Sequence, residues 1–326
     1  MNNDINYICD IIKTNMENLN IGINVQKLIE QLKNITSDQR KVYFNTIEKK
    51  FVKSKFLADL MLNECGLYIA RAIYAEKYVN NIAVKYNFIS DSLYTKYKED
   101  GFLIVPNFLP VADFDDLCRE VEIVIKNTTL SGTGDCGLHK IFLKKDWSRI
   151  QNFYKNQNLI DILKKCSYNP KYCGDEHRQY IEILRHISPD KDIQKTWHVD
   201  TFHPTCKWWF YIEDINENQG PLNYIRSSHL NTSKKLEYEH ILVNKTLKQL
   251  KHGDIGNIEG SLRFYNDEII KSLGYVQDQY TNMALPKNTL IVVNTRGIHR
   301  RGHGKVGAVR VSLASSLRSN IFSIPC

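Results

Sequence analysis

Short β-rich runs dominate the chain from about residue 140 onward, and they limit the folds that it can adopt. They are separated by turns that contain Gly, Pro and Asn. The clearest of these runs are 180–184, 207–212, 289–293 and 308–313. Many short strands joined by such turns are typical of a barrel or a two-sheet sandwich.

The first hundred residues have a different, helical pattern in which Gly and Pro are nearly absent. Apolar residues recur there at helical spacing, namely Val25, Leu28, Ile29, Leu32 and Ile35. Residues 36–39 form a capping-box pattern that predicts the start of another helix. We therefore expect a layer of packed helices that serves as a scaffold or as a dimerisation surface.

A strand and a helix are predicted between these two regions. The apolar run 102–106 predicts the strand. The helix that follows presents one apolar face, made by Phe114, Leu117, Cys118, Val121 and Val124.

Composition narrows the class of protein. With 42% hydrophobic and 25% charged residues, the 326-residue chain resembles a globular protein. No apolar run approaches the roughly 18 residues of a membrane span, and no basic signal segment begins the chain, so we expect a cytoplasmic protein without membrane contact. The eight cysteines include no C-x-x-C pair, which favours reduced thiols. The net charge of +8 comes largely from lysines scattered along helical segments, so nucleic-acid binding is disfavoured.

The strongest candidate for a metal site is His198-Val199-Asp200. Roughly one such triplet is expected by chance in a chain of this composition, so its context must decide. On a strand, residues i and i+2 share a face, so His198 and Asp200 can reach one ion. A distant histidine would complete the two-histidine, one-carboxylate set that holds non-heme Fe(II) with open coordination positions. We favour His299 over His203, which would leave the strand face, and over His303, which lies between glycines in a predicted turn.

Arg310 follows His299 by eleven residues and is the candidate anion anchor. A guanidinium presents a planar fork that binds a carboxylate through two hydrogen bonds. Ser312 alternates onto the same strand face, and its hydroxyl is predicted to add a further hydrogen bond. The pair would suit the far carboxylate of 2-oxoglutarate, whose 2-oxo acid end chelates iron.

In this order, the residues resemble the phytanoyl-CoA dioxygenase-like family of Fe(II)/2-oxoglutarate-dependent oxygenases over roughly residues 94–318. The matching segments are 97–109, Trp197 to Asp200, 218–222 with 227–229, and His299 with Arg310. The usual Pro-Gly before the Ser-His of 228–229 is missing, so that turn is expected to differ, and we interpret His229 as structural.

The resemblance implies an α+β chain whose core is a double-stranded β-helix (jelly-roll, cupin-like) with flanking helices. Residues 1–92 are predicted to be a helical N-terminal extension, and residues 93–326 the oxygenase domain. An insertion at about 231–286 is expected to be either a lid over the site or a passive surface excursion.

The resemblance also implies an enzyme that oxidises an unactivated C–H bond and releases succinate and CO2. The substrate does not follow from the resemblance, but a small, carboxylated metabolite fits the basic residues around the predicted site. Hydroxylation, desaturation and oxidative cyclisation in biosynthetic tailoring all stay open, while retention of Asp200 disfavours halogenation. His198, Asp200 and His299 would be the catalytic metal ligands, and Arg310 and Ser312 would bind the co-substrate. Fe(II), 2-oxoglutarate and O2 are the expected cofactors, with ascorbate a candidate reductant. The candidate substrate contacts are Trp197, His203, Arg185, Trp209 and Arg301.

Two other classes of protein stay open. A nucleic-acid demethylase of the same fold would suit the positive charge, but its two arginines would be more closely spaced than Arg310 and Arg318. A jelly-roll protein that binds without catalysis is disfavoured because the predicted ligand set is complete. The expected partner is a small-molecule substrate, and a homodimer through the N-terminal helices is an open alternative.

Overall fold

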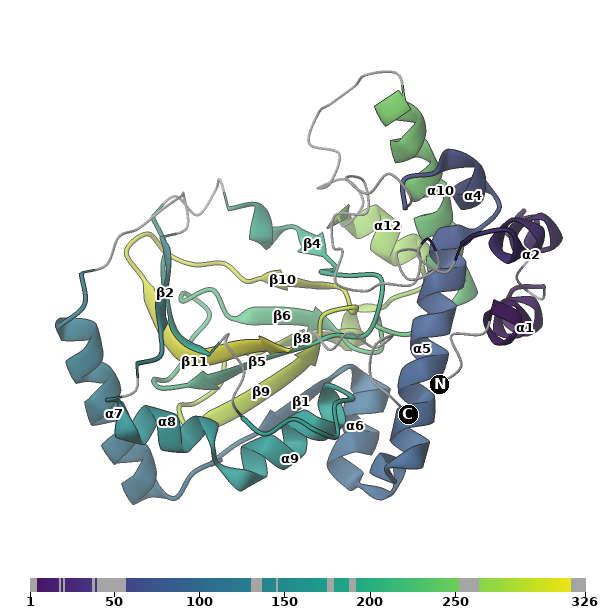
Figure 1. The fold of residues 1–326 in the computed structure, drawn as a ribbon. Helices are drawn as coiled ribbons and strands as arrows, with labels where there is room; N and C mark the ends of the chain where they lie inside the picture. The colour runs from purple at the N-terminus through teal and green to yellow at the C-terminus, as the bar shows by residue number, and fades with distance from the viewer. Residues whose placement is uncertain are drawn as a thin grey trace.

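Two antiparallel sheets form the centre of the computed structural model, and helices surround them (Figure 1). The structure describes residues 5–17, 19, 21–36, 39, 57–129, 137–144, 146–174, 179–187, 192–251 and 264–317.

The larger sheet has six strands in the order β1-β9-β5-β11-β3-β2. Their bounds are β1 (Phe102–Val105), β2 (Leu138–Phe142), β3 (Tyr180–Arg185), β5 (Cys206–Tyr211), β9 (Thr289–Asn294) and β11 (Val309–Leu317). The smaller sheet has five strands in the order β7-β4-β10-β6-β8. Their bounds are β4 (Trp197–His198), β6 (Leu222–Ile225), β7 (Phe264–Tyr265), β8 (Tyr280–Asn282) and β10 (His299–Arg301).

The order in which the chain visits the sheets defines the fold. It runs from β3 in the larger sheet to β4 in the smaller one, and then through β5, β6, β7, β8, β9, β10 and β11. The four strands β3, β11, β5 and β9 are neighbours in one sheet, and β4, β10, β6 and β8 are neighbours in the other. This interleaving of two antiparallel four-stranded units is a jelly roll, so the predicted double-stranded β-helix is confirmed.

Alternation along β5 separates two cores. Trp208 and Phe210 point outward into a cluster shared with helices, whereas Trp209 and Tyr211 point inward between the sheets. Successive strand residues face opposite sides, so the run of four aromatic residues from Trp208 to Tyr211 can serve both cores. The inner face of β5 is the one that reaches the site described below.

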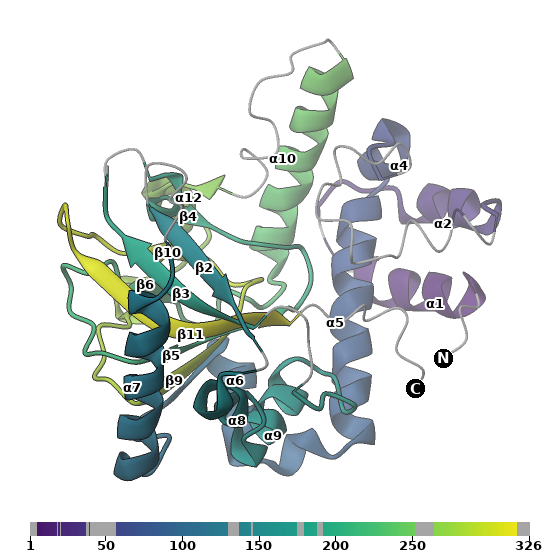
Figure 2. The same ribbon diagram turned by 60° about the vertical axis from the view of Figure 1, so that its left-hand side comes forward.

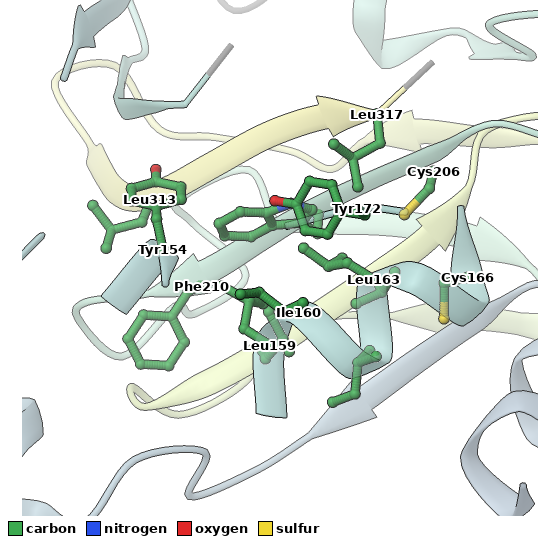
Figure 3. Close-up of a cluster of buried hydrophobic side chains, with 14 of the residues drawn as sticks. Tyr154, Leu159, Ile160, Leu163, Cys166, Tyr172, Cys206, Phe210, Leu313 and Leu317 are labelled. Atoms are coloured by element: carbon green, nitrogen blue, oxygen red, sulfur yellow. The ribbon is translucent and has the colours of Figure 1, made fainter. Parts of the chain in front are cut away.

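Four helices cover the outer face of the larger sheet: α6 (Ser92–Asp100), α7 (Val111–Lys126), α8 (Ser148–Tyr154) and α9 (Gln157–Cys166). In Figure 3, Tyr154 and Leu159 lie over Phe210 and Leu313 of the sheet. The Tyr154 hydroxyl donates to the carbonyl of Tyr180 at 3.0 Å. Burying each such apolar side chain stabilises the fold by roughly 1.5–3 kcal/mol. The face predicted for 111–126 is confirmed: Phe114, Leu117, Val121 and Val124 are buried, and Cys118 is partly buried.

A second group of helices comes from the N-terminal region: α1 (Ile5–Met16), α2 (Val25–Lys33), α4 (Leu60–Glu64) and α5 (Leu67–Lys85). Helix α2 begins at Val25 because the Asn24 side chain accepts from the backbone N–H of Lys27. The predicted capping box also forms: the Gln39 backbone donates to Thr36 Oγ1 at 3.2 Å, and the Thr36 backbone donates to Gln39 Oε1 at 2.8 Å. The body of the helix that it would start lies outside the described residues.

Helix α10 (Ser233–Lys251) packs against α4 and α5, so the N-terminal helices and the predicted insertion share one core (Figure 2). Leu236, Val243 and Leu247 of α10 lie in that core, and Phe202 joins them from the loop after β4. The segment 231–286 also contains α12 (Asp267–Ser272) and the strands β7 and β8, which belong to the smaller sheet. Much of this segment therefore belongs to the smaller sheet or packs against the N-terminal helices. That the segment closes over the site stays a prediction.

Within the described ranges, no helix combines the length and the apolar character needed to cross a membrane. The cysteines in those ranges are free thiols, as expected from their spacing.

Candidate metal centre

His198 and His299 meet because β4 and β10 are neighbours in the smaller sheet. The two residues are directly paired across the strands, and their ring centroids are 4.5 Å apart. Asp200 lies two residues beyond His198, just past the end of β4. One possible ligand atom from each of His198, Asp200 and His299 lies within 4.8 Å of the others. Sheet register thus brings together residues that are about a hundred positions apart.

Backbone carbonyls orient both imidazoles. The Nδ1 of His198 lies 2.7 Å from the Thr196 oxygen, and the Nδ1 of His299 lies 2.9 Å from the Gly297 oxygen. A carbonyl oxygen only accepts hydrogen bonds, so Nδ1 carries the proton in each ring. Nε2 is then the ring nitrogen that can coordinate a metal, an arrangement common in metal-binding histidines. Two imidazole nitrogens and one carboxylate fit Fe(II) with open positions.

The turn at 294–298 supports Asp200 and His299 together. The Asp200 backbone N–H donates to the Thr295 oxygen at 2.9 Å, and the Thr295 N–H donates to the Thr205 oxygen at 3.0 Å. The same turn contains Gly297, whose carbonyl orients His299. A displacement of this turn would therefore move two of the candidate ligands.

A buried ion pair between Arg296 and Glu239 connects this turn to helix α10. Arg296 donates from Nη1 and Nη2 to the two carboxylate oxygens of Glu239 in α10, at 2.5 and 2.7 Å. The Tyr265 hydroxyl donates to the same carboxylate, and Lys235 Nζ donates to the Arg296 carbonyl at 3.2 Å. Burial alone would raise the pKa of Glu239, but Arg296 and Lys235 reverse that effect and hold it below its usual value. Glu239 is therefore a carboxylate that balances the buried guanidinium.

The three candidate ligands lie in the wall of a cavity of about 400 Å³. Cavities of this size suit small molecules. Its other charged lining residues are Lys140, Glu182, Asp192, Lys207, Arg300, Arg301 and Arg310. Basic groups outnumber acidic ones in this wall, so the cavity favours an anionic ligand.

Arg310 lies in this wall, and its side chain is almost completely buried. Its Nη1 donates to the Gly220 carbonyl at 2.6 Å, and its Nη2 donates to Glu182 Oε1 at 3.2 Å. The same Glu182 oxygen accepts from Trp209 Nε1 at 3.0 Å. Burial raises the pKa of Glu182, but Arg310, Lys207 and Arg301 outweigh burial and lower it overall. The sequence gives no local signal for the role of Glu182, which is one acid inside the otherwise apolar first part of β3.

Ser312 shares a strand face with Arg310, as predicted, but it does not line the cavity. It lies directly opposite Glu182 of β3 and is fully buried. Its hydroxyl has no hydrogen-bond partner among the described residues. Contact between Ser312 and a co-substrate stays a prediction.

The predicted substrate contacts divide into two groups. Trp209 and Arg301 line the cavity, although Arg301 is already paired with Asp192. Trp197, His203 and Arg185 are not among the lining residues.

The reason differs for each of these three side chains. Trp197 points away from its neighbour His198 and packs under the guanidinium of Arg300, 4.2 Å from the ring centroid. His203 is buried beside the ring of Phe202, and Arg185 is exposed at the end of β3.

Two further histidines lie apart from the cluster. His303 is exposed, and the clustered ligand atoms come from His299 instead. His229 Nε2 lies 3.0 Å from the Lys98 carbonyl oxygen, and burial lowers the pKa of His229 to about 4. A neutral imidazole that ties α6 to the turn after β6 agrees with the structural role that we assigned to His229.

No family model and no curated protein matches this chain. Among solved structures, it is similar to the non-heme alpha ketoglutarate dependent epimerase SnoN from nogalamycin biosynthesis, with 14% identity and a TM-score of 0.43 over 71% of this chain and 83% of that one. It is also similar to HygX from Streptomyces hygroscopicus with nickel and 2-oxoglutarate bound, with 11% identity and a TM-score of 0.39 over 69% and 85% of the two chains. The carbocyclase SnoK, also from nogalamycin biosynthesis, gives 12% identity and a TM-score of 0.39 over 69% and 82%.

Similarities at these TM-scores establish no activity for this chain. The site itself offers two oriented imidazoles and one carboxylate in the wall of a basic cavity, together with a buried arginine. Such a site can hold one metal ion whose open positions face a bound small anion.

Proposed function

We propose that this protein is an Fe(II)/2-oxoglutarate-dependent oxygenase of the phytanoyl-CoA dioxygenase-like kind, acting on a small, carboxylated metabolite. One observation carries the proposal: His198, Asp200 and His299 share a cavity with Arg310. A two-histidine, one-carboxylate set suits iron, and a buried guanidinium suits the far carboxylate of a keto-diacid. Either feature alone is common, but their presence in one cavity favours this chemistry.

In this proposal His198, Asp200 and His299 bind Fe(II) from one side. Fe(II), 2-oxoglutarate and O2 would together supply the oxidising chemistry needed for an unactivated C–H bond, with succinate and CO2 as the co-products. The carbonyls of Thr196 and Gly297 keep both imidazoles in the coordinating tautomer. Arg310 would bind the far carboxylate of the co-substrate, and Trp209 lines the same cavity.

The cavity wall also favours a substrate that carries negative charge. Lys140, Lys207 and Arg300 add basic groups to the wall, whereas Asp192 balances Arg301. The protein selects hydroxylation, desaturation or cyclisation by how it holds the substrate carbon relative to the metal. Ascorbate would serve as a reductant that keeps the iron ferrous.

Anaerobic titration tests the proposal. Wild-type protein with Fe(II) and 2-oxoglutarate should develop a visible charge-transfer band, and it should release succinate when O2 and a stimulating metabolite are added. Mass spectrometry of the product then separates a gain of one oxygen from a loss of two hydrogens. Absence of both the band and 2-oxoglutarate consumption would refute the proposed activity.

A further inference from the structure

Glu182 places a buried carboxylate against the arginine that is proposed to anchor the co-substrate. We propose that Glu182 is a specificity-determining residue: it weakens the preference for a 2-oxo acid with a second carboxylate over one without it. The inference rests on the proposed function and concerns the co-substrate end of the same cavity.

The first step is geometric. Glu182 pairs with Lys140 of β2 on one side and with Ser312 of β11 on the other, which places its side chain on the inner face of the larger sheet. From there it reaches Arg310 Nη2 at 3.2 Å. The Gly220 carbonyl accepts a hydrogen bond from Nη1 at 2.6 Å, so both terminal nitrogens of Arg310 already donate to acceptors of this chain.

The second step is electrostatic. The side chains of Arg310 and Glu182 are 7% and 5% exposed, so water screens their interaction weakly. An incoming carboxylate would have to share the guanidinium with Glu182, and the two negative charges would repel each other. A 2-oxo acid that ends in an alkyl group avoids this repulsion and can lie against the Trp209 ring, which also lines the cavity.

Another role for Glu182 makes the opposite prediction. If Glu182 only holds Arg310 in place, then loss of its charge should weaken the binding of 2-oxoglutarate. If it competes for Arg310, loss of its charge should strengthen that binding. Glu182→Gln separates the two because the amide oxygen can still accept from Trp209 Nε1 and Arg310 Nη2.

The experiment compares two co-substrates of equal carbon number on the full-length protein loaded with Mn(II). Calorimetry would give the dissociation constants of 2-oxoglutarate and of 2-oxopentanoate, which lacks the second carboxylate. We expect wild type to favour 2-oxoglutarate by no more than about tenfold. Glu182→Gln should bind 2-oxoglutarate at least about tenfold more tightly, with little change for 2-oxopentanoate.

Asp192→Asn is the matched control because it removes one buried acid from the same wall but acts on Arg301. It should shift the ratio of the two dissociation constants by less than roughly threefold. An equal shift in this variant would show a general charge effect and overturn the proposal.

Other outcomes are equally decisive. Weaker or unchanged 2-oxoglutarate binding by Glu182→Gln would overturn the proposal, as would a wild-type preference for 2-oxoglutarate above about tenfold. The ratio of the two dissociation constants in wild type can still overturn the proposal if the variant does not fold. Failure of Mn(II)-loaded wild type to bind either acid would overturn the proposed function as well.

Discussion

Arg296 and Glu239 form a bidentate ion pair that joins helix α10 to the turn carrying His299. Both side chains are almost completely buried, at 1% and 2% exposed. The Arg296 guanidinium also donates to Asn231 Oδ1 at 2.9 Å, and the Asn231 amide donates to Glu76 of α5 at 2.7 Å. The N-terminal helices are thus linked through Asn231 and Arg296 to the turn that supports two candidate metal ligands.

Glu239→Gln should destabilise the protein by about 3–5 kcal/mol, because it leaves the Arg296 charge buried without a countercharge. The free energy of unfolding in urea measures the effect. Lys248→Gln in the same helix is the control: its ion pair with Glu64 is solvent-exposed, so a change within about 1 kcal/mol is expected. A loss below about 1 kcal/mol in Glu239→Gln would contradict the structural role of the pair.

Metal binding should depend on each of the three candidate ligands. Alanine at position 198, 200 or 299 removes one donor from a set that leaves the other coordination positions open, so Fe(II) stoichiometry should fall to near zero at micromolar metal. Anaerobic equilibrium dialysis measures it. His303→Ala removes an exposed imidazole and should bind metal as wild type does. Normal stoichiometry in any one of the three variants would show that the ligand set is different.

Arg310→Ala should raise the dissociation constant of 2-oxoglutarate by roughly a hundredfold, because it removes the anchor and also leaves the Glu182 carboxylate unbalanced next to the far carboxylate of the co-substrate. Arg185→Ala, at the exposed end of β3, is the matched control and should leave it unchanged. Calorimetry on the metal-loaded protein compares the two. If both variants bind 2-oxoglutarate equally well, the anchor lies elsewhere in the cavity.

Acid should remove the stabilisation that Glu182 and Glu239 provide. The folded-state pKa of each is below its usual value, with Arg310 and Arg296 the main opposing charges to burial. Their contribution is therefore complete above the unfolded pKa of about 4.3, and it is lost as the pH falls through the lower folded pKa. Urea unfolding from pH 6 to pH 3 should show the stability gap between wild type and Glu239→Gln shrinking below about pH 4. A gap that is constant over this range would mean that the pKa of Glu239 is the same in the folded and the unfolded protein.

Local pattern was enough to predict several helices and strands, although the helices α8, α9 and α10 lie in a region that was expected to consist mainly of short strands. Val25, Leu28, Ile29 and Leu32 are buried along α2, and β9 and β11 begin within a residue of their predicted positions. These features depend on the period of apolar residues, which neighbouring positions determine. His198 and Asp200 are close because they are two residues apart, although β4 ends at His198 and Asp200 lies beyond the strand.

Tertiary structure decided the rest of the site. His299 reaches His198 only because β10 lies beside β4, and Glu182 reaches Arg310 because β3 lies beside β11. Glu239 occurs in a lysine-rich helix where nothing in the local sequence marks it as buried. Sequence alone predicted the segments with a clear apolar period and the residues that could bind metal, because those properties are set by near neighbours. Which charges face one another depended on strand register and on the packing of α10, because their partners are distant in the chain.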